Sequence, residues 1–124
     1  MADQTPPPLP RLDRSVLDGH REVLGDETVR DVIARFLDTA PATAMAAAEA
    51  AAAGDLVILA KQAHKLAGGA LTLGLAALND IARRAEHEAK TGAPAEAIAA
   101  ATALPDALDA ARRELQDYLT GLGR

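Results

Sequence analysis

The chain has 124 residues, a length that favours one domain with a single modest core. Apolar residues make up 49% of the chain and charged residues 25%, a balance that is typical of globular rather than disordered proteins. Only 2% of the residues are aromatic, which disfavours a β-sandwich. The formal net charge of −5 disfavours general binding to nucleic acid, and the lack of cysteine excludes disulfides, thiolate chemistry and cysteine-based zinc sites.

The start of the chain differs from the rest in composition. Four prolines, at positions 6, 7, 8 and 10, predict an extended or disordered leader over residues 1–11, with the folded domain spanning residues 12–124. This leader has neither the basic start nor the apolar stretch of a signal peptide, and no apolar run approaches the ~20 residues of a membrane span. We therefore expect a cytoplasmic protein that does not bind a membrane.

From Leu12 onward, apolar residues recur every three or four positions, which is the spacing of amphipathic helices. Short connections between such helices predict an all-α fold, an antiparallel up-down four-helix bundle with a short additional N-terminal helix. Asp26 and Asp55 are expected to cap the second and third helices, and Pro105 either kinks the last helix or lies just before its start. The residues expected to end or begin the helices are Gly25, Asp26, Gly54, Asp55, Gly74, Gly92 and Pro94.

The third helix carries polar residues and glycines on the face opposite its apolar stripe. At 100° per residue, with the core direction set by its leucines and alanines, His64 points well away from the core. The other residues expected on this outward face or at its edge are Val57, Lys61, Lys65, Gly68, Leu71 and Thr72. The sequence thus predicts an exposed imidazole beside cations, with bare glycine backbone one turn on and an apolar collar.

Two adjacent glycines interrupt this helix. Gly68 and Gly69 each cost about 1 kcal/mol relative to alanine in a helix interior. Because alanine is abundant elsewhere in the chain, this cost indicates that a bulky partner or a phosphoryl group needs room beside His64. A neutral imidazole nitrogen is a good nucleophile near neutral pH, and ammonium groups attract an anionic phosphoryl group. Gly69 is also angled to serve as a packing notch for a neighbouring helix.

The fourth helix is expected to fold back on the third near Gly74. Residues equally distant from that turn would then lie abreast, which places Arg84 opposite His64. This register predicts that Arg83, Arg84 and His87 extend the basic patch.

The stretch from Ala63 to Ala70 resembles the histidine phosphotransfer (HPt) domain. That family's pattern is a histidine, an apolar residue two positions on, usually a lysine three on, a glycine four on and a second glycine ten on. The resemblance covers about residues 12–120. Further residues that fit it are Phe36, Gly54, Asp55, Gly74, Leu78 and Glu86, the last in the acidic position often seen near the end of the next helix.

The resemblance implies a phosphohistidine carrier in a multistep phosphorelay of bacterial two-component signalling. His64 would accept a phosphoryl group from the aspartyl phosphate of a response-regulator receiver domain and pass it on to another receiver. Gly68 would leave room for the partner, and Lys61 and Lys65 would supply positive charge. The residues expected to bind the partner are Val57, Gly69, Leu71, Thr72 and Arg84.

The same resemblance sets the expected requirements of the chain. The receiver supplies the Mg²⁺ site, so the domain itself needs no cofactor or metal, and nothing in its sequence would bind ATP. We expect a monomer with a transient docking face, and a hybrid histidine kinase as a further partner.

One position departs from the family's pattern, because Ala67 stands where the usual lysine would be. Lys61, Lys65 and Arg84 are candidates to supply the missing cation. Two alternatives to the carrier remain open. One is a catalytically inactive HPt-like interaction module that docks a receiver or kinase domain, and the other is a structural dimerising bundle whose glycine face packs against another helix.

Overall fold

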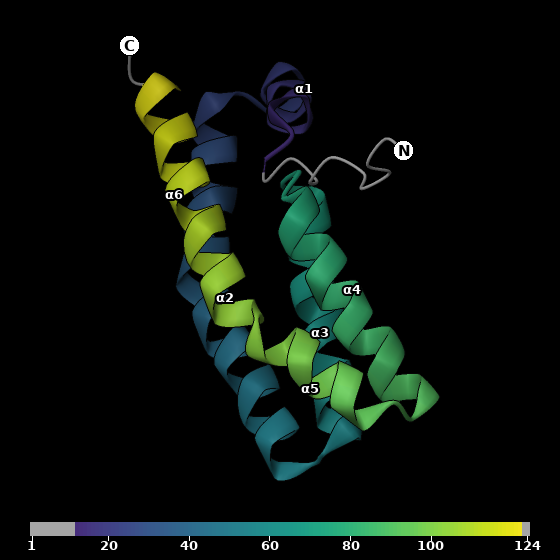
Figure 1. The fold of residues 1–124 in the computed structure, drawn as a ribbon. Coiled ribbons are helices and arrows are strands. Elements are labelled where there is room, and N and C mark those ends of the chain that lie inside the picture. The colour runs from purple at the N-terminus through teal and green to yellow at the C-terminus, as the bar shows by residue number, and fades with distance from the viewer. Residues whose placement is uncertain (1–11, 123–124) are drawn as a thin grey trace, which may run out of the picture.

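The computed structural model describes residues 12–122, and this part of the chain is helical with no strand, which confirms the all-α class (Figure 1). The leader expected over residues 1–11 lies outside the described residues. None of the helices within residues 12–122 has the length and apolar character needed to cross a membrane. Six helices follow one another in this part of the chain: α1 (Arg14–Leu24), α2 (Asp26–Ala53), α3 (Leu56–Thr72), α4 (Ala76–Thr91), α5 (Pro94–Thr102) and α6 (Leu104–Leu122).

The long helices pack in pairs, with α2 beside α6 and α3 beside α4 (Figure 1). Helix α2 also packs against α3, which joins the two pairs, while α1 and α5 lie at opposite ends of the molecule. The core between the helices is built from leucine, alanine and a few β-branched residues. Its largest fully buried side chains include Leu17, Ile33, Leu59, Leu66, Leu78, Leu104 and Leu115.

The helix ends follow the expected residues, with one exception. Asp55 caps α3, because its carboxylate accepts a hydrogen bond from the Ile58 amide at 3.0 Å. The expectation that Asp26 caps α2 is wrong. Gly25 holds the cap position, and Asp26 is the first residue of the helix, where its carboxylate pairs with Arg21 at 2.8 Å.

The last expected helix is divided in two near Pro105. Helix α5 ends at Thr102 and α6 begins at Leu104, so that Pro105 is the second residue of α6. A proline has no amide hydrogen to donate and its ring clashes with the carbonyl four residues earlier, here at the end of α5, so a single helix cannot run through this point undisturbed. Pro41 is accommodated differently, since α2 continues through it at an exposed position.

The turn between α3 and α4 is fastened to the start of α1. Gly74 has a φ of +76°, a conformation that residues with a side chain rarely adopt. A Cβ at this position would also lie 2.7 Å from the Asp13 carbonyl oxygen. The Asp13 amide donates a hydrogen bond to the Gly74 carbonyl at 2.7 Å, and this contact fixes the point at which α4 folds back.

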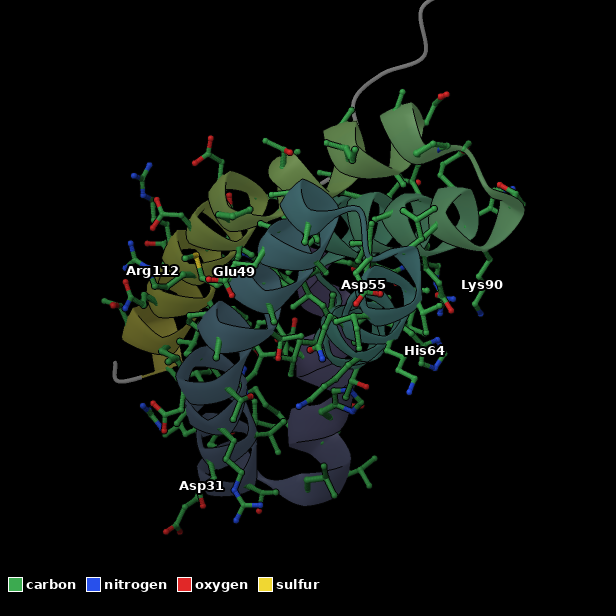
Figure 2. All side chains as sticks on the ribbon, turned by 90° about the horizontal axis from the view of Figure 1, so that it is seen from below. Asp31, Glu49, Asp55, His64, Lys90 and Arg112 are labelled. Atoms are coloured by element: carbon green, nitrogen blue, oxygen red, sulfur yellow. The ribbon has the colours of Figure 1, made fainter. Side chains whose placement is uncertain are left out.

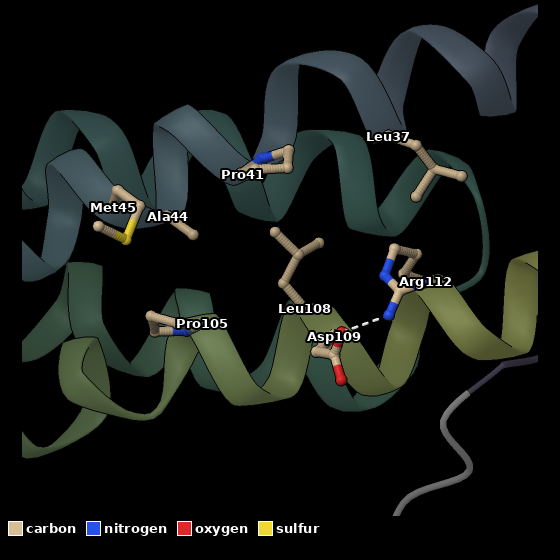
Figure 3. A pocket seen from close by; sticks show the side chains of 8 residues that line it. All are labelled: Leu37, Pro41, Ala44, Met45, Pro105, Leu108, Asp109 and Arg112. Carbon is tan, nitrogen blue, oxygen red and sulfur yellow. Dashed lines mark hydrogen bonds and ion pairs between the residues drawn. The ribbon is translucent and has the colours of Figure 1, made fainter.

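A groove of about 280 Å³ lies between α2 and α6 (Figure 3). Its walls are mostly apolar, formed by Leu37, Pro41, Met45 and Leu108 among others. The charged residues at its edge, Asp109 and Arg112, pair with each other at 2.6 Å. This groove contains no histidine and no unpaired cation, so it lacks the chemistry expected of the outward face of α3.

Candidate functional site

Helix α3 presents His64 to solvent, as its periodicity predicts. The His64 side chain is 72% exposed, and the residues around it on the same face are exposed as well. Val57 and Leu71, the expected apolar collar, are 68% and 56% exposed, which is high for large apolar residues. The other exposed residues of this outward face are Lys61, Lys65, Gly68 and Thr72.

The two glycines of α3 face different surroundings. A Cβ built on Gly68 would have no atom within 4 Å, so nothing within the described chain requires a glycine there. A Cβ on Gly69 would lie 2.9 Å from Cε1 of Phe36, a ring carried by α2. This contact confirms the expectation that Gly69 is a packing notch for a neighbouring helix, and its contact with a partner stays a prediction. Gly69 is the notch that receives Phe36, whereas Gly68 leaves open backbone one turn from His64.

Small residues bring α3 and α4 together beside His64. Ala63 and Ala85 are both fully buried and belong to one apolar cluster. Alanine allows two helices to approach closely, so the residues that follow these two alanines meet across the helix pair. These residues are His64 on α3 and Glu86 on α4.

The His64 ring and the Glu86 carboxylate form a direct contact. Nδ1 of His64 lies 2.9 Å from Oε2 of Glu86, and the same oxygen accepts a hydrogen bond from Nζ of Lys90 at 2.8 Å. The Glu86 side chain is only 10% exposed, whereas that of Lys90 is 62% exposed. Figure 2 shows His64 and Lys90 projecting from the same side of the molecule.

The charge of Glu86 determines how the ring is protonated. The hydrogen bond from Lys90 lowers the pKa of Glu86, and the bond with His64 acts in the same direction, although burial opposes both. An ionised carboxylate can only accept hydrogen bonds, so Nδ1 of His64 must carry the hydrogen. In the neutral ring the lone pair is then on Nε2, the nitrogen that does not face Glu86.

The cations of this face divide into two groups. Lys61 and Lys65 form no ion pair with any residue in the described part of the chain, so their ammonium groups are available to an anion. Arg84 pairs instead with Asp80 at 3.3 Å, and Arg83 donates to Asn79 at 3.1 Å. The prediction that Arg84 lies opposite His64 is wrong, because Glu86 occupies that place.

Sequence reasoning missed Lys90 and gave Glu86 only a minor part. A signal was present, because a glutamate followed by a lysine four residues later is a favourable pair on one helix face.

The other histidines do not join the site. His20 lies 2.8 Å from the Thr72 carbonyl oxygen, and His87 is exposed. Within residues 12–122, no three acidic or histidine side chains gather as ligands for a metal ion.

Comparison with known proteins gives one match. A family model described as the Hpt domain matches residues 31–114, which include most of α2, all of α3, α4 and α5, and the first half of α6. No curated protein and no solved structure matches the chain. Members of this family act in histidine phosphotransfer and interact with receiver domains and kinases in phosphorelays. Since the match covers more than half of its residues, the chain belongs to the Hpt domain family.

Proposed function

We propose that this chain is a phosphohistidine carrier in which Nε2 of His64 accepts a phosphoryl group from a receiver domain and returns it to the same or another receiver. The observation that carries the proposal is the 2.9 Å contact between the exposed His64 ring and the buried carboxylate of Glu86. This contact orients the ring and leaves Nε2 free to react.

The step balances without a further reactant. The Nε2 lone pair forms a bond to phosphorus while the bond from phosphorus to the aspartyl oxygen breaks, and the electron pair leaves on that oxygen. The Nδ1 hydrogen remains in place, so the phosphorylated ring carries a positive charge. The ionised Glu86 carboxylate faces this charge and stabilises the product.

The outward face of α3 is the proposed docking surface for the receiver. The apolar side chains of Val57 and Leu71 flank it, and the open backbone at Gly68 lets a partner approach His64. Lys61 and Lys65 would hold the phosphoryl oxygens, with Thr72 and Arg84 at the rim. Mg²⁺ belongs to the receiver, and the carrier uses no cofactor of its own.

The scaffold of this site is the proposed four-helix bundle of α2, α3, α4 and α6, with α1 as the additional N-terminal helix. A hybrid histidine kinase that carries a receiver domain is a suitable partner for the same surface. The proposal includes a monomeric carrier, because the docking face must be free when the receiver arrives.

The first test compares wild type with His64→Gln in phosphate uptake from a phosphorylated receiver domain. Wild type should acquire acid-labile, alkali-stable label, and the variant should acquire none, while circular dichroism of the two proteins remains the same. Uptake by the variant would contradict the assignment of His64.

One result of this test would favour the other candidate function. If neither protein takes up phosphate from several receivers, yet both bind a receiver equally well, the chain is an interaction module. Buried Ala67 is the observation that favours this second function, because α3 then offers no cation three residues after His64.

A further inference from the structure

We propose that Lys90 is a positioning residue of the phosphotransfer site, one that acts through Glu86 to fix which nitrogen of His64 reacts. This inference rests on the proposed function of His64. Nζ of Lys90 and Nδ1 of His64 bind the same oxygen of Glu86, at 2.8 Å and 2.9 Å. Three groups from two helices therefore form one hydrogen-bonded chain.

The position of this carboxylate explains why a cation is needed beside it. The Glu86 side chain is only 10% exposed, and burial of a carboxylate favours its protonated form. A protonated Glu86 could donate a hydrogen bond to Nδ1, which would move the ring hydrogen to Nε2 and remove the nucleophilic lone pair. A cation that keeps Glu86 ionised prevents this exchange.

Lys90 is the cation that the structure provides for this purpose. The charged groups that face the Glu86 carboxylate are His64 from α3 and Lys90 from α4 itself. Helices α5 and α6 also pack against α4, but within residues 12–122 they place no ion-pair partner on this carboxylate. On α3, the residue three positions after His64 is the buried Ala67, which has no charge to offer.

Lys90 differs in this respect from Lys61 and Lys65, which remain unpaired within the described residues and face solvent beside His64. Those two lysines are placed to contact a phosphoryl group, whereas Lys90 is bound to the carboxylate behind the ring. Removal of the Lys90 ammonium group should therefore alter the tautomer of His64 in the absence of any partner or phosphate.

The test measures the free protein by NMR and then its reaction. Wild type, Lys90→Gln and Lys90→Arg are compared, with Arg113→Gln as the matched control. Arg113 also forms an exposed pair with a carboxylate four residues away, Asp109, but on α6. Carbon-13 spectra follow the titration of the Glu86 carboxyl group, and nitrogen-15 spectra report which ring nitrogen of His64 carries the hydrogen.

In Lys90→Gln the pKa of Glu86 should rise, because the hydrogen bond that lowers it most is lost while burial remains. The share of His64 with hydrogen on Nε2 should increase, and phosphate uptake should be slowed about three- to tenfold, most strongly at the acid end of the pH profile. Lys90→Arg should restore all three properties, and Arg113→Gln should match wild type.

Unchanged spectra of Lys90→Gln would overturn the role proposed for Lys90. If Lys90→Gln leaves the Glu86 titration and the His64 tautomer unchanged, Lys90 is not a positioning residue, whatever the rate of uptake. The spectra need no phosphoryl donor, so they decide this point even if wild type fails to take up phosphate. That failure would overturn the proposed function alone.

Discussion

The two faces of α3 differ although they share one helix and one short stretch of sequence. The inward face is dry and closely packed, with Ala63, Leu66 and Ala70 fully or almost fully buried. The outward face carries an exposed histidine, unpaired lysines and open glycine backbone. Contacts within the chain account for the residues of the inward face, but they do not account for those of the outward face.

Gly68 and Gly69 show this difference most clearly. Both weaken the helix by a similar amount, since glycine is about 1 kcal/mol less favourable than alanine. For Gly69 the structure supplies a reason, because the Phe36 ring lies where a Cβ would be. For Gly68 no atom of the described chain supplies one, and we attribute this glycine to the proposed docking of a partner.

Among substitutions that leave His64 in place, the largest effect is expected when Gly68 is replaced by a bulky residue. Gly68→Gln should slow phosphate uptake from a receiver about tenfold or more, because its side chain would fill the open space beside His64. Rates measured with the same phosphorylated receiver check this. The fold should be unaffected, and a variant that reacts as fast as wild type would show that no partner approaches at Gly68.

A smaller effect should separate the two glycines in stability. Gly68→Ala should stabilise the protein by about 1 kcal/mol, because it improves helix propensity at an open position. Gly69→Ala gains the same propensity but forces the Phe36 ring to move, so it should destabilise by about 1 kcal/mol on balance. Urea unfolding of both variants measures the difference. Equal stabilisation by the two substitutions would mean that Phe36 yields without cost.

The smallest effect concerns the two unpaired lysines. Lys61 lies one turn before His64 on the same face, whereas Lys65 lies at its edge. Lys61→Ala should therefore slow phosphate uptake about two- to fivefold, and Lys65→Ala less, with both effects reduced at high salt. If the two variants react equally fast, position relative to His64 does not determine the contribution of these lysines.

Much of the helical architecture could be predicted from the sequence because its signals are local. The 3.6-residue period of α3 placed His64, Val57 and Leu71 outward, and their exposure confirms this. The cap at Asp55 and the break near Pro105 were likewise readable, since each depends on the chemistry of one or two residues. The prediction that Asp26 caps α2 is wrong because Gly25 occupies the cap position and the Asp26 carboxylate pairs with Arg21.

Local sequence patterns could not predict which residues of α3 and α4 lie opposite each other. A fold-back centred on Gly74 predicted Arg84 opposite His64, whereas the structure pairs His64 with Glu86, so the centre lies one residue further on. A shift of one position at the turn changes the opposing residue by two, and rotation of α4 then decides whether that residue faces inward. The turn itself is bound to Asp13, through a contact between residues far apart in the sequence that local patterns do not reveal.

The contrast between Gly74 and Gly68 has an evolutionary consequence. Gly74 is held by its backbone conformation and by the Asp13 carbonyl, so selection for a folded protein alone would keep it. Gly68 has no such protection, because alanine would improve the helix at no cost to the fold. In a lineage that stopped exchanging phosphate with a partner, Gly68 should drift to other residues while Gly74 remains. The residues found at these two positions among descendants would therefore indicate whether the proposed phosphate exchange has been kept.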